Sequence, residues 1–281
     1  MDKNSWTLVI RPQNKWFNLN LKEVWDAKDL LKMFVWRDFI SLYKQTVLGP
    51  LWLVIQPILN TSVYSLVFGS IAHISTEGLP RPLFYLSGII GWNYFSDCLL
   101  RTGNTFSANS GIFGKVYFPR LIVPLSVIIS NLFKFFVQFL LFLIILSFFI
   151  FKGGNAHPNN FILLTPLLLI IMAGLGLGFG LIISSLTTKY RDLQNLVAFG
   201  VQLLMYGSSV VIPLSAVGEK YRWLIIANPI THVIETFKFA YMGTGSFNWF
   251  CLSYSFLFMI FLVFAGIIVF NRTDKSFIDT V

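Results

Sequence analysis

One stretch decides the class of this chain: Leu121–Phe151 reads LIVPLSVIISNLFKFFVQFLLFLIILSFFIF and contains a single charged residue, Lys134. A helix needs about 20 mostly apolar residues to cross the hydrocarbon core of a bilayer. The stretch exceeds that length, so it is predicted to span a membrane. The whole chain agrees, because 56% of its residues are hydrophobic and 12% are charged, against about 25% charged residues in soluble domains.

Five further stretches of suitable length lie on either side. They are Pro50–Ile74, Pro82–Leu100 (with Asp97 as its one charge), Phe161–Leu186, Leu193–Ile212 and Phe247–Phe270. The sequence therefore predicts an all-α integral membrane protein with six transmembrane helices and both termini on one side. Most Lys and Arg residues between the spans would then lie on that side, and the positive-inside rule makes it the cytoplasm. We expect a multi-pass protein of the cytoplasmic (inner) membrane.

The chain divides into residues 1–49, a six-helix domain over residues 50–270, and a tail of residues 271–281. Within the first part, Val24, Leu31, Val35, Phe39 and Leu42 recur at steps of seven, four and three. This pattern indicates an amphipathic helix that is too charged to span and that lies in the cytoplasmic interface, among membrane lipids. A soluble helix that packs on another protein is the alternative.

Two connections between the spans are long and half apolar. Residues 103–120 would lie in the cytoplasm, where they either dock into a groove of a partner or simply connect two spans. Residues 213–246 would be external and have the length of two short helices, with a break at Asn228-Pro229. Two re-entrant helices at an external gate would explain them, because irregular backbone enters a membrane only under a protein cover; a surface hairpin is the alternative.

Lys134 is the ionisable residue that lies deepest in a predicted span. Asn131, Lys134 and Gln138 are spaced by three and four, so they form one polar stripe on a helix. An ionisable residue inside a membrane is a functional candidate. In one interpretation the stripe faces a polar conduit, and Lys134 meets an anionic group of a transported molecule. In the other, the Lys134 side chain extends to the lipid head groups on the cytoplasmic side.

Aromatic side chains are the other candidates for contact with a transported molecule. Sugar rings pack their C–H faces on aromatic rings, so a pore lined by Tyr, Trp and Phe suits a glycan. The candidate channel residues in the predicted spans are Tyr64, Tyr85, Trp92, Tyr94, Phe95 and Tyr206. The alternative is the aromatic belt that membrane proteins place at both interfaces.

Several kinds of chemistry are not indicated. The segment from Gly111 to Lys115 is too short for a phosphate-binding loop and is not followed by Ser or Thr,. The histidines have no metal-binding spacing, and no set of catalytic side chains can be assembled. The net charge of +9 is divided among short segments, which does not indicate nucleic-acid binding,. We interpret the chain as a non-enzyme. Gly174, Gly176, Gly178 and Gly180 predict close helix packing.

The chain also contains an ordered series of short motifs. They are Val35–Asp38 (VWRD), Tyr43–Thr46 (YKQT), Leu48–Trp52 (LGPLW), Gln56-Pro57, Lys115–Arg120 (KVYFPR) with Pro124, Tyr190–Asp192 (YRD), and Asn228–Ile230 (NPI) with Glu235. In this order they resemble the ABC-2 type permeases that export polysaccharides, over nearly the whole chain. The chain departs from the family pattern at Gly207–Ser209, where a Ser-Pro pair is usual, so the motif does not fix where that helix ends.

The resemblance implies a permease subunit that forms a homodimer and binds two copies of an ATP-binding cassette subunit. ATP and Mg would bind to that subunit, and no cofactor is expected in this chain. The first amphipathic helix would be an interface helix, and residues 213–246 a pair of gate helices. Residues implied to contact the cassette are Ser110, Ile112, Phe113, Lys115, Tyr190, Arg191 and Asp192.

The cargo of this family is a lipid-linked glycan, such as O-antigen, capsule or teichoic acid. Its head group would arrive laterally near the cytoplasmic leaflet, where Arg37, Lys44 and Lys134 could hold it. Two rival classes remain: an ABC-2 permease for a drug or small lipid, and an ion-coupled carrier. The carrier would be expected to show internal repeats and charged coupling sites, which the sequence does not show.

Overall fold

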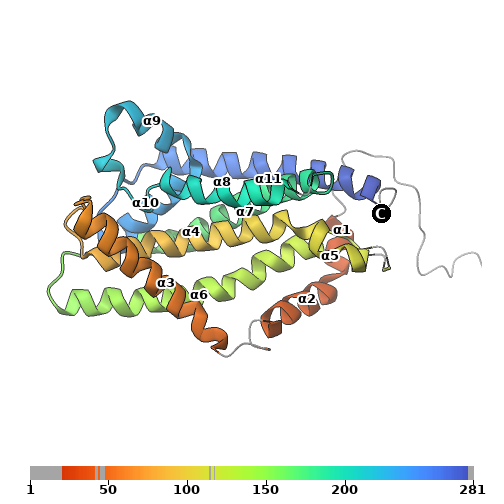
Figure 1. Ribbon diagram of the computed structural model, residues 1–281, viewed down its shortest axis with the longest axis horizontal. Coiled ribbons are helices and arrows are strands. Elements are labelled where there is room, and N and C mark those ends of the chain that lie inside the picture. The colour runs from red at the N-terminus through yellow and green to blue at the C-terminus, as the bar shows by residue number, and fades with distance from the viewer. Residues whose placement is uncertain are drawn as a thin grey trace, which may run out of the picture.

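The computed structural model describes residues 21–41, 44, 48–113, 115–116, 118–190 and 192–277. The regular secondary structure of these residues is entirely helical, which confirms the all-α class. The long helices run side by side as one bundle (Figure 1). In chain order the helices are α1 (Leu21–Asp26), α2 (Lys28–Ser41), η1 (Gly49–Leu51), α3 (Trp52–Tyr64), η2 (Ser65–Ile71), α4 (Arg81–Gly103), α5 (Thr105–Phe113), α6 (Ile122–Phe151), η3 (Asn160–Leu164), α7 (Thr165–Thr187), α8 (Leu193–Tyr206), η4 (Leu214–Ala216), α9 (Glu219–Ala227), α10 (Pro229–Met242) and α11 (Trp249–Phe277).

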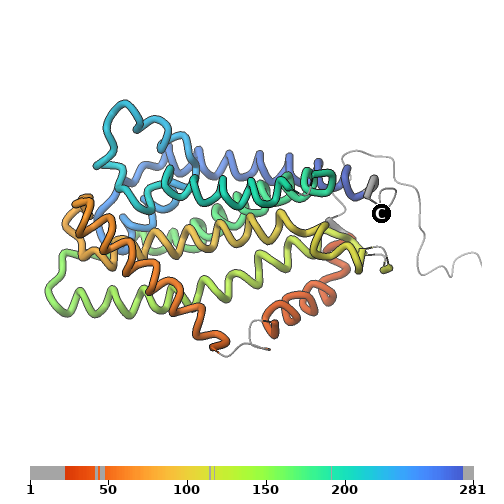
Figure 2. Tube along the Cα trace, in the orientation of Figure 1, coloured from red at the N-terminus to blue at the C-terminus, as the bar shows by residue number. Residues whose placement is uncertain are grey.

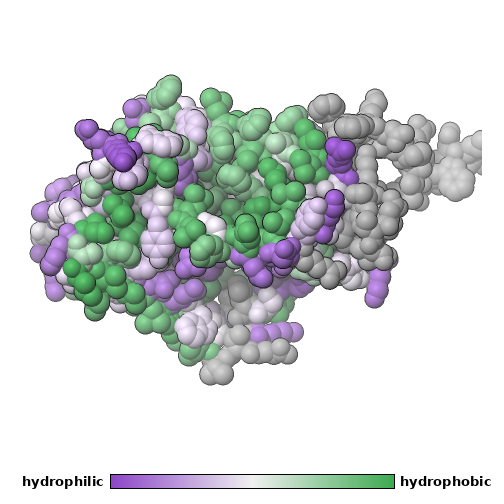
Figure 3. Space-filling model, turned by 45° about the horizontal axis from the view of Figure 1, so that its top comes forward, coloured by the Kyte–Doolittle hydropathy of each residue, from purple (hydrophilic) through white to green (hydrophobic). Residues whose placement is uncertain are grey.

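Four helical stretches of the described residues are long and apolar enough to cross a membrane: Gly49–Ile71, Ile122–Phe151, Asn160–Thr187 and Trp249–Asp274. They correspond to the predicted first, third, fourth and sixth spans, so the chain is a multi-pass membrane protein. Apolar side chains make up much of the face seen in Figure 3. A surface of this kind suits contact with lipid tails.

The second predicted span is the 23-residue helix α4, which lies inside the bundle. Its polar residues lower its average hydropathy, and its neighbours α3, α6, α7 and α10 bury most of its side chains. A helix of this length extends about 34 Å, which is enough to cross the hydrocarbon core.

The fifth predicted span is shorter than expected. Helix α8 has 14 residues and ends at Tyr206 instead of continuing to Ile212. Gly207 follows, and the Ser208 hydroxyl donates to the carbonyl of Met205 at 2.7 Å, which turns the chain away from the helix. At 1.5 Å per residue α8 is about 21 Å long, less than the thickness of the hydrocarbon core.

The glycines of α7 let it pack closely against two helices on opposite sides. A Cβ atom on Gly176 or Gly180 would come within 3.0 Å of α4, at the carbonyls of Phe95 and Leu99. A Cβ on Gly178 would come within 2.9 Å of the backbone of α11, at Leu262 and Val263. The predicted close packing is confirmed, and α7 lies between α4 and α11.

Distinct sets of short helices lie at the two ends of the bundle (Figure 2). At one end, Phe34 of α2, Phe106 and Phe113 of α5, and Phe270 of α11 form one apolar cluster. The C-terminal part of α11 is attached there too, because Arg120 pairs with Asp274 at 2.5 Å. Helices α9 and α10 lie at the other end (Figure 1). The sequence predicted that residues 21–44, 103–120 and 271–281 lie on one side and residues 213–246 on the other; the described parts of these segments lie at opposite ends of the bundle in this way, and residues 278–281 lie outside the described residues.

Candidate functional site

Helices α4 and α6 face each other through a row of polar contacts. Asn93 Nδ2 donates to Gln138 Oε1 at 3.4 Å, Lys134 Nζ donates to Asp97 Oδ2 at 2.6 Å, and Arg101 Nη1 donates to Asn131 Oδ1 at 3.1 Å. The polar residues of α4 are four positions apart, and their partners on α6 are four and three positions apart. Both spacings keep side chains on one face of a helix, so the two polar faces meet. The polar stripe of Asn131, Lys134 and Gln138 lies on one face, as predicted, and the group that meets Lys134 is a carboxylate of the same chain.

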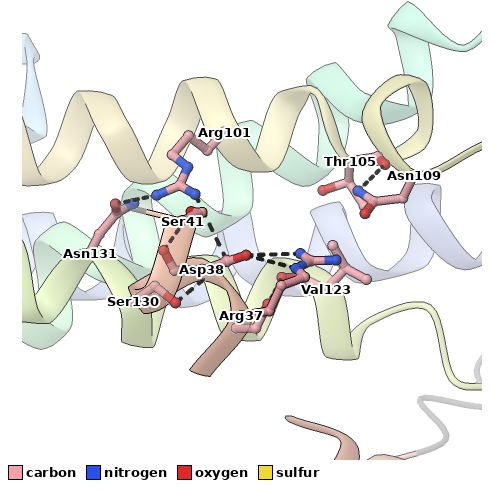
Figure 4. A network of polar contacts seen from close by, with 10 residues as sticks. Arg37, Asp38, Ser41, Arg101, Thr105, Asn109, Val123, Ser130 and Asn131 are labelled. Carbon is pink, nitrogen blue, oxygen red and sulfur yellow. Dashed lines mark hydrogen bonds and ion pairs between the residues drawn. The ribbon is translucent and has the colours of Figure 1, made fainter. Parts of the chain in front are cut away.

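Helix α2, which the sequence predicts to be amphipathic, joins this polar row through Asp38 (Figure 4). Arg37 Nη2 donates to Asp38 Oδ1 at 2.9 Å, and Arg101 Nη2 lies 3.8 Å from Asp38 Oδ2. Ser130 Oγ of α6 donates to the same Oδ2 at 3.5 Å. Two arginines and one carboxylate therefore meet where α2, α4 and α6 converge, and the group carries a net positive charge.

Sequence reasoning missed Asp38 and the partners of Lys134, although a signal for both was present. Asp38 follows Leu31 by seven residues, which places it on the apolar face of the amphipathic helix. Asn93, Asp97 and Arg101 repeat at steps of four and match the polar stripe on the next span. A buried charge requires a partner, so this match could have predicted that Asp97 pairs with Lys134.

Three of the aromatic candidates lie together toward the end of the bundle where α9 and α10 lie. The rings of Tyr64 and Tyr85 are 6.3 Å apart, and Phe68 lies 5.7 Å from Tyr64 and 6.4 Å from Tyr206. Tyr206 is 40% exposed, whereas Tyr85 is buried and its hydroxyl has no hydrogen-bond partner among the described residues. These four residues, Tyr64, Phe68, Tyr85 and Tyr206, form the aromatic cluster discussed below.

The other three aromatic candidates lie inside the bundle. Trp92 packs on Phe95 with ring centroids 5.3 Å apart, and Tyr94 packs on Phe135 of α6 at 5.5 Å. Each of the three is at most 4% exposed. They fill the core between α4 and its neighbours and do not join the aromatic cluster, a division that residue type alone could not reveal.

The two expected cytoplasmic contact segments are neighbours. Gln194 at the start of α8 donates to Asn104 and to Ser107 of α5, both at 2.9 Å. On α5 and after it, Ser110, Ile112 and Lys115 are exposed, and so are Tyr190 and Asp192. Phe113 is instead buried against Phe106 and Phe118, so it anchors α5. Arg191 lies outside the described residues. Gln194 was missed, since a single polar residue at a helix start has no distinct pattern.

The two basic residues expected to hold a head group differ in their surroundings. Arg37 is bound to Asp38, and its guanidinium carbon lies 4.5 Å from the centroid of the Phe34 ring. Lys44 is exposed beyond the end of α2. The structure therefore groups Arg37 with Arg101 and Lys134 near the α2 side of the bundle.

A buried ionic group fixes α10 at the opposite end. Ser209 Oγ donates to Glu235 Oε1, and Lys238 Nζ donates to the carbonyl of Ser209. Glu235 Oε2 also accepts from the backbone N–H of Ser246 at 2.9 Å, and Lys238 Nζ lies 3.7 Å from the centroid of the Phe84 ring. The expected break is present: Asn228 Oδ1 accepts from the N–H of Ile230 at 3.2 Å, and Pro229 begins α10.

The fold is a helical membrane bundle with a polar row between α4 and α6 and with short helices at both ends. The sequence profile of the ABC-2 type transporter family matches residues 29–242. The chain therefore belongs to the ABC-2 type transporter family. The match begins in α2 and ends with α10, so it includes both sets of short helices.

Curated relatives cover most of the chain. The O-antigen export system permease protein RfbA of Klebsiella pneumoniae is 27% identical over 251 residues, which is 89% of this chain and 94% of that protein. The protein of the same description from Myxococcus xanthus is 27% identical over 78% of this chain and 82% of its own length. The polysialic acid transport protein KpsM of Escherichia coli is 26% identical over 87% of this chain and 93% of its own length.

Proposed function

We propose that the chain is the permease subunit of an ATP-driven exporter that moves a lipid-linked polysaccharide across the inner membrane. The observation that carries this proposal is the similarity, along nearly the whole chain, to permeases described as exporting O-antigen and transporting polysialic acid. Two copies of the chain would form the dimer, and two ATP-binding cassette subunits would hydrolyse ATP. Six crossings, with α4 and α8 added to the four apolar spans, would leave both termini in the cytoplasm.

In this proposal the exposed part of α5 and the segment from Tyr190 to Asp192 contact the cassette subunit. Gln194 supports this role, because its two hydrogen bonds hold both segments in one surface. The side chains available for contact are Ser110, Ile112, Lys115, Tyr190 and Asp192. The buried Phe113 positions α5 on the bundle.

The aromatic cluster would line the glycan path at the dimer interface, next to the gate formed by α9 and α10. The partly exposed rings of Tyr64 and Tyr206 present flat surfaces that sugar C–H groups can stack on, and the buried ring of Tyr85 supports that of Tyr64. The lipid head group would approach from the cytoplasmic leaflet near Arg37, Lys44 and Lys134. Its negative charge fits the net positive charge of this region.

The first test is purification of the chain from its native membrane in mild detergent, with its bound partners identified by mass spectrometry. We expect an ATP-binding cassette ATPase in equal amount, and hydrolysis of ATP by the complex. Deletion of the gene should leave the lipid-linked glycan inside the cell. A homo-oligomer that retains no ATPase would contradict the proposal. Export of a small lipid in place of a glycan would instead favour the rival ABC-2 class.

The second test removes rings from the aromatic cluster. Replacement of Tyr64 and Tyr206 together by Ala should slow glycan export by about fivefold to a hundredfold, since aromatic contacts contribute roughly 0.5–1.5 kcal/mol each and 1.4 kcal/mol is a factor of ten. ATP hydrolysis without cargo should persist. Phe261→Ala is the control, because Phe261 is an exposed ring on α11, away from the cluster. Unchanged export by the double variant would show that the glycan takes another path.

A further inference from the structure

Asp38 is the charged residue of α2 that the structure buries, with 7% of its surface exposed. The other ion pair of this helix, Lys32 with Asp29, lies on the outside, where both side chains are largely exposed. The carboxylate of Asp38 points instead toward α4 and α6 (Figure 4). Its environment therefore differs from that of an ordinary surface charge on an amphipathic helix.

The contacts of Asp38 divide between its two oxygens. Oδ1 accepts from Nε and Nη2 of Arg37 on its own helix, at 3.1 and 2.9 Å. Oδ2 faces other helices, with Arg101 Nη2 of α4 at 3.8 Å and Ser130 Oγ of α6 at 3.5 Å. One oxygen thus secures the carboxylate locally, and the other joins α2 to the bundle.

Attachment of α2 to the bundle does not require this charge. Phe34 packs on Phe118 with ring centroids 5.7 Å apart, and Phe39 packs on Phe133 of α6 at 4.8 Å. Apolar contacts of this kind hold a helix but are not directional. An ion pair whose arginine side chain is 43% exposed adds little net stability,, but its two partners must stay within reach of each other, which limits how far one helix can move relative to the other. The Asp38–Arg101 pair therefore sets the position of α2 along α4.

Helix α4 connects this pair to the gate end of the molecule. Arg101 lies near the end of α4, and Phe84 and Gly88 lie toward its start. The ring of Phe84 is under Lys238 of α10 at 3.7 Å, and a Cβ on Gly88 would come within 3.0 Å of Val210, just after α8. Helix α4 is buried along most of its length, so its neighbours leave it little space to bend. A displacement of one end of α4 should therefore move the other end as well.

We propose that the Asp38–Arg101 ion pair transmits movement of α2 to α4, and through α4 to the segments around Val210 and Lys238 at the gate end. The inference rests on the proposed function and extends it, because the movement of the cassette subunits would have to reach α2 as well as α5. Arg101 is thus a positioning residue for transport: it fixes α4 to α2 without contacting the cassette or the glycan.

Arg101→Gln is the variant that tests this role. The side chain of Arg101 is 43% exposed, and Asp38 keeps Arg37 and Ser130 as partners when Arg101 is replaced. The variant therefore leaves no buried charge alone and is expected to fold and to bind the ATPase. In proteoliposomes of the whole complex, the amount of glycan exported per ATP hydrolysed should fall about tenfold, within the usual range of coupling between distant sites. The rate of hydrolysis should stay within a factor of two.

Lys32→Gln is the matched control, because it removes a cation from the exposed face of α2. It should leave the amount of glycan exported per ATP hydrolysed unchanged. Three results with Arg101→Gln overturn the inference. The first is an unchanged amount of glycan exported per ATP hydrolysed, and the second is a loss of export and hydrolysis in equal proportion. The third is a recovery of export at higher concentrations of lipid-linked glycan, which would make Arg101 a residue that binds the glycan or its lipid. If this variant does not accumulate, Asp38→Glu replaces it; it keeps the charge, shifts the carboxylate by one methylene and should also lower the ratio. A wild-type chain that binds no ATPase overturns the proposed function as well.

Discussion

Lys238→Met is expected to destabilise the protein by about 3 kcal/mol or more, since loss of one partner from a buried ionic group leaves the other charge buried without a partner. Lys238 is fully buried and Glu235 is 1% exposed. Ser209 bridges them, with its hydroxyl on the carboxylate and its carbonyl on the ammonium. Without the ammonium, Glu235 has a negative charge in an apolar core and the carbonyl of Ser209 loses a donor. Thermal unfolding in detergent measures the loss.

The control for this prediction is Lys220→Met, which makes the same change at an exposed lysine of the neighbouring helix α9. It should leave the unfolding midpoint nearly unchanged, because surface substitutions generally stay within about 0.5 kcal/mol. The double variant Glu235→Gln with Lys238→Met should regain at least half of the lost stability, because no buried charge remains. If the two single losses simply add in the double variant, Glu235 and Lys238 do not act as one group.

The ends of α10 show how much the sequence alone could predict. Asn228 caps the first turn and Pro229 supplies the fixed φ that suits it, while Gly243 takes a φ of 73° at the other end, which glycine adopts readily,. These signals are local, so the break at Asn228-Pro229 was predictable. The long apolar spans were predictable for the same reason, because length and composition decide them.

The end of α8 and the division among the aromatic residues depend on distant parts of the chain. The apolar run from Leu193 to Ile212 continues past Tyr206, but Lys238, which lies 29 residues after Ser209, binds the carbonyl of Ser209 in the turn beyond the helix. Tyr85 and Tyr94 have the same chemistry and lie on the same helix, α4. Only the placement of α3 and α6 around that helix puts Tyr85 in the aromatic cluster and Tyr94 against Phe135.

The partners of Asp38 could not be predicted from the sequence, although its place on α2 could. The spacing of seven residues from Leu31 places Asp38 on the apolar side of the helix, but its contacts are with Arg101 and Ser130, which belong to two other helices. The kinds of residue in the candidate site, basic and aromatic, could thus be predicted, but the Asp38–Arg101 pairing depends on how the helices pack.

Gly178→Ala should weaken the packing of α7 on α11 and lower the stability by about 1–3 kcal/mol, the usual cost of added atoms in a filled core. The new Cβ would lie 2.8 Å from the carbonyl carbon of Leu262 and 2.9 Å from the backbone nitrogen of Val263. Neither atom can rotate away as a flexible side chain would, so α11 itself must shift. The fraction of protein that survives heating, measured by size-exclusion chromatography in detergent, should fall accordingly.

Gly200→Ala makes the same substitution in α8, where a Cβ would meet nothing within 4 Å. Alanine is more favourable than glycine inside a helix by roughly 0.5–1 kcal/mol, so this variant should be as stable as the wild type or slightly more stable. The expected changes in stability have opposite signs for Gly178→Ala and Gly200→Ala. Comparison of the two variants therefore separates the cost of a packing clash from the gain in backbone entropy. A Gly178→Ala protein as heat-resistant as the wild type would mean that α7 and α11 are not in close contact. If Gly200→Ala instead lost as much stability as expected for Gly178→Ala, another molecule, such as a second copy at a dimer interface, would cover α8 at this position.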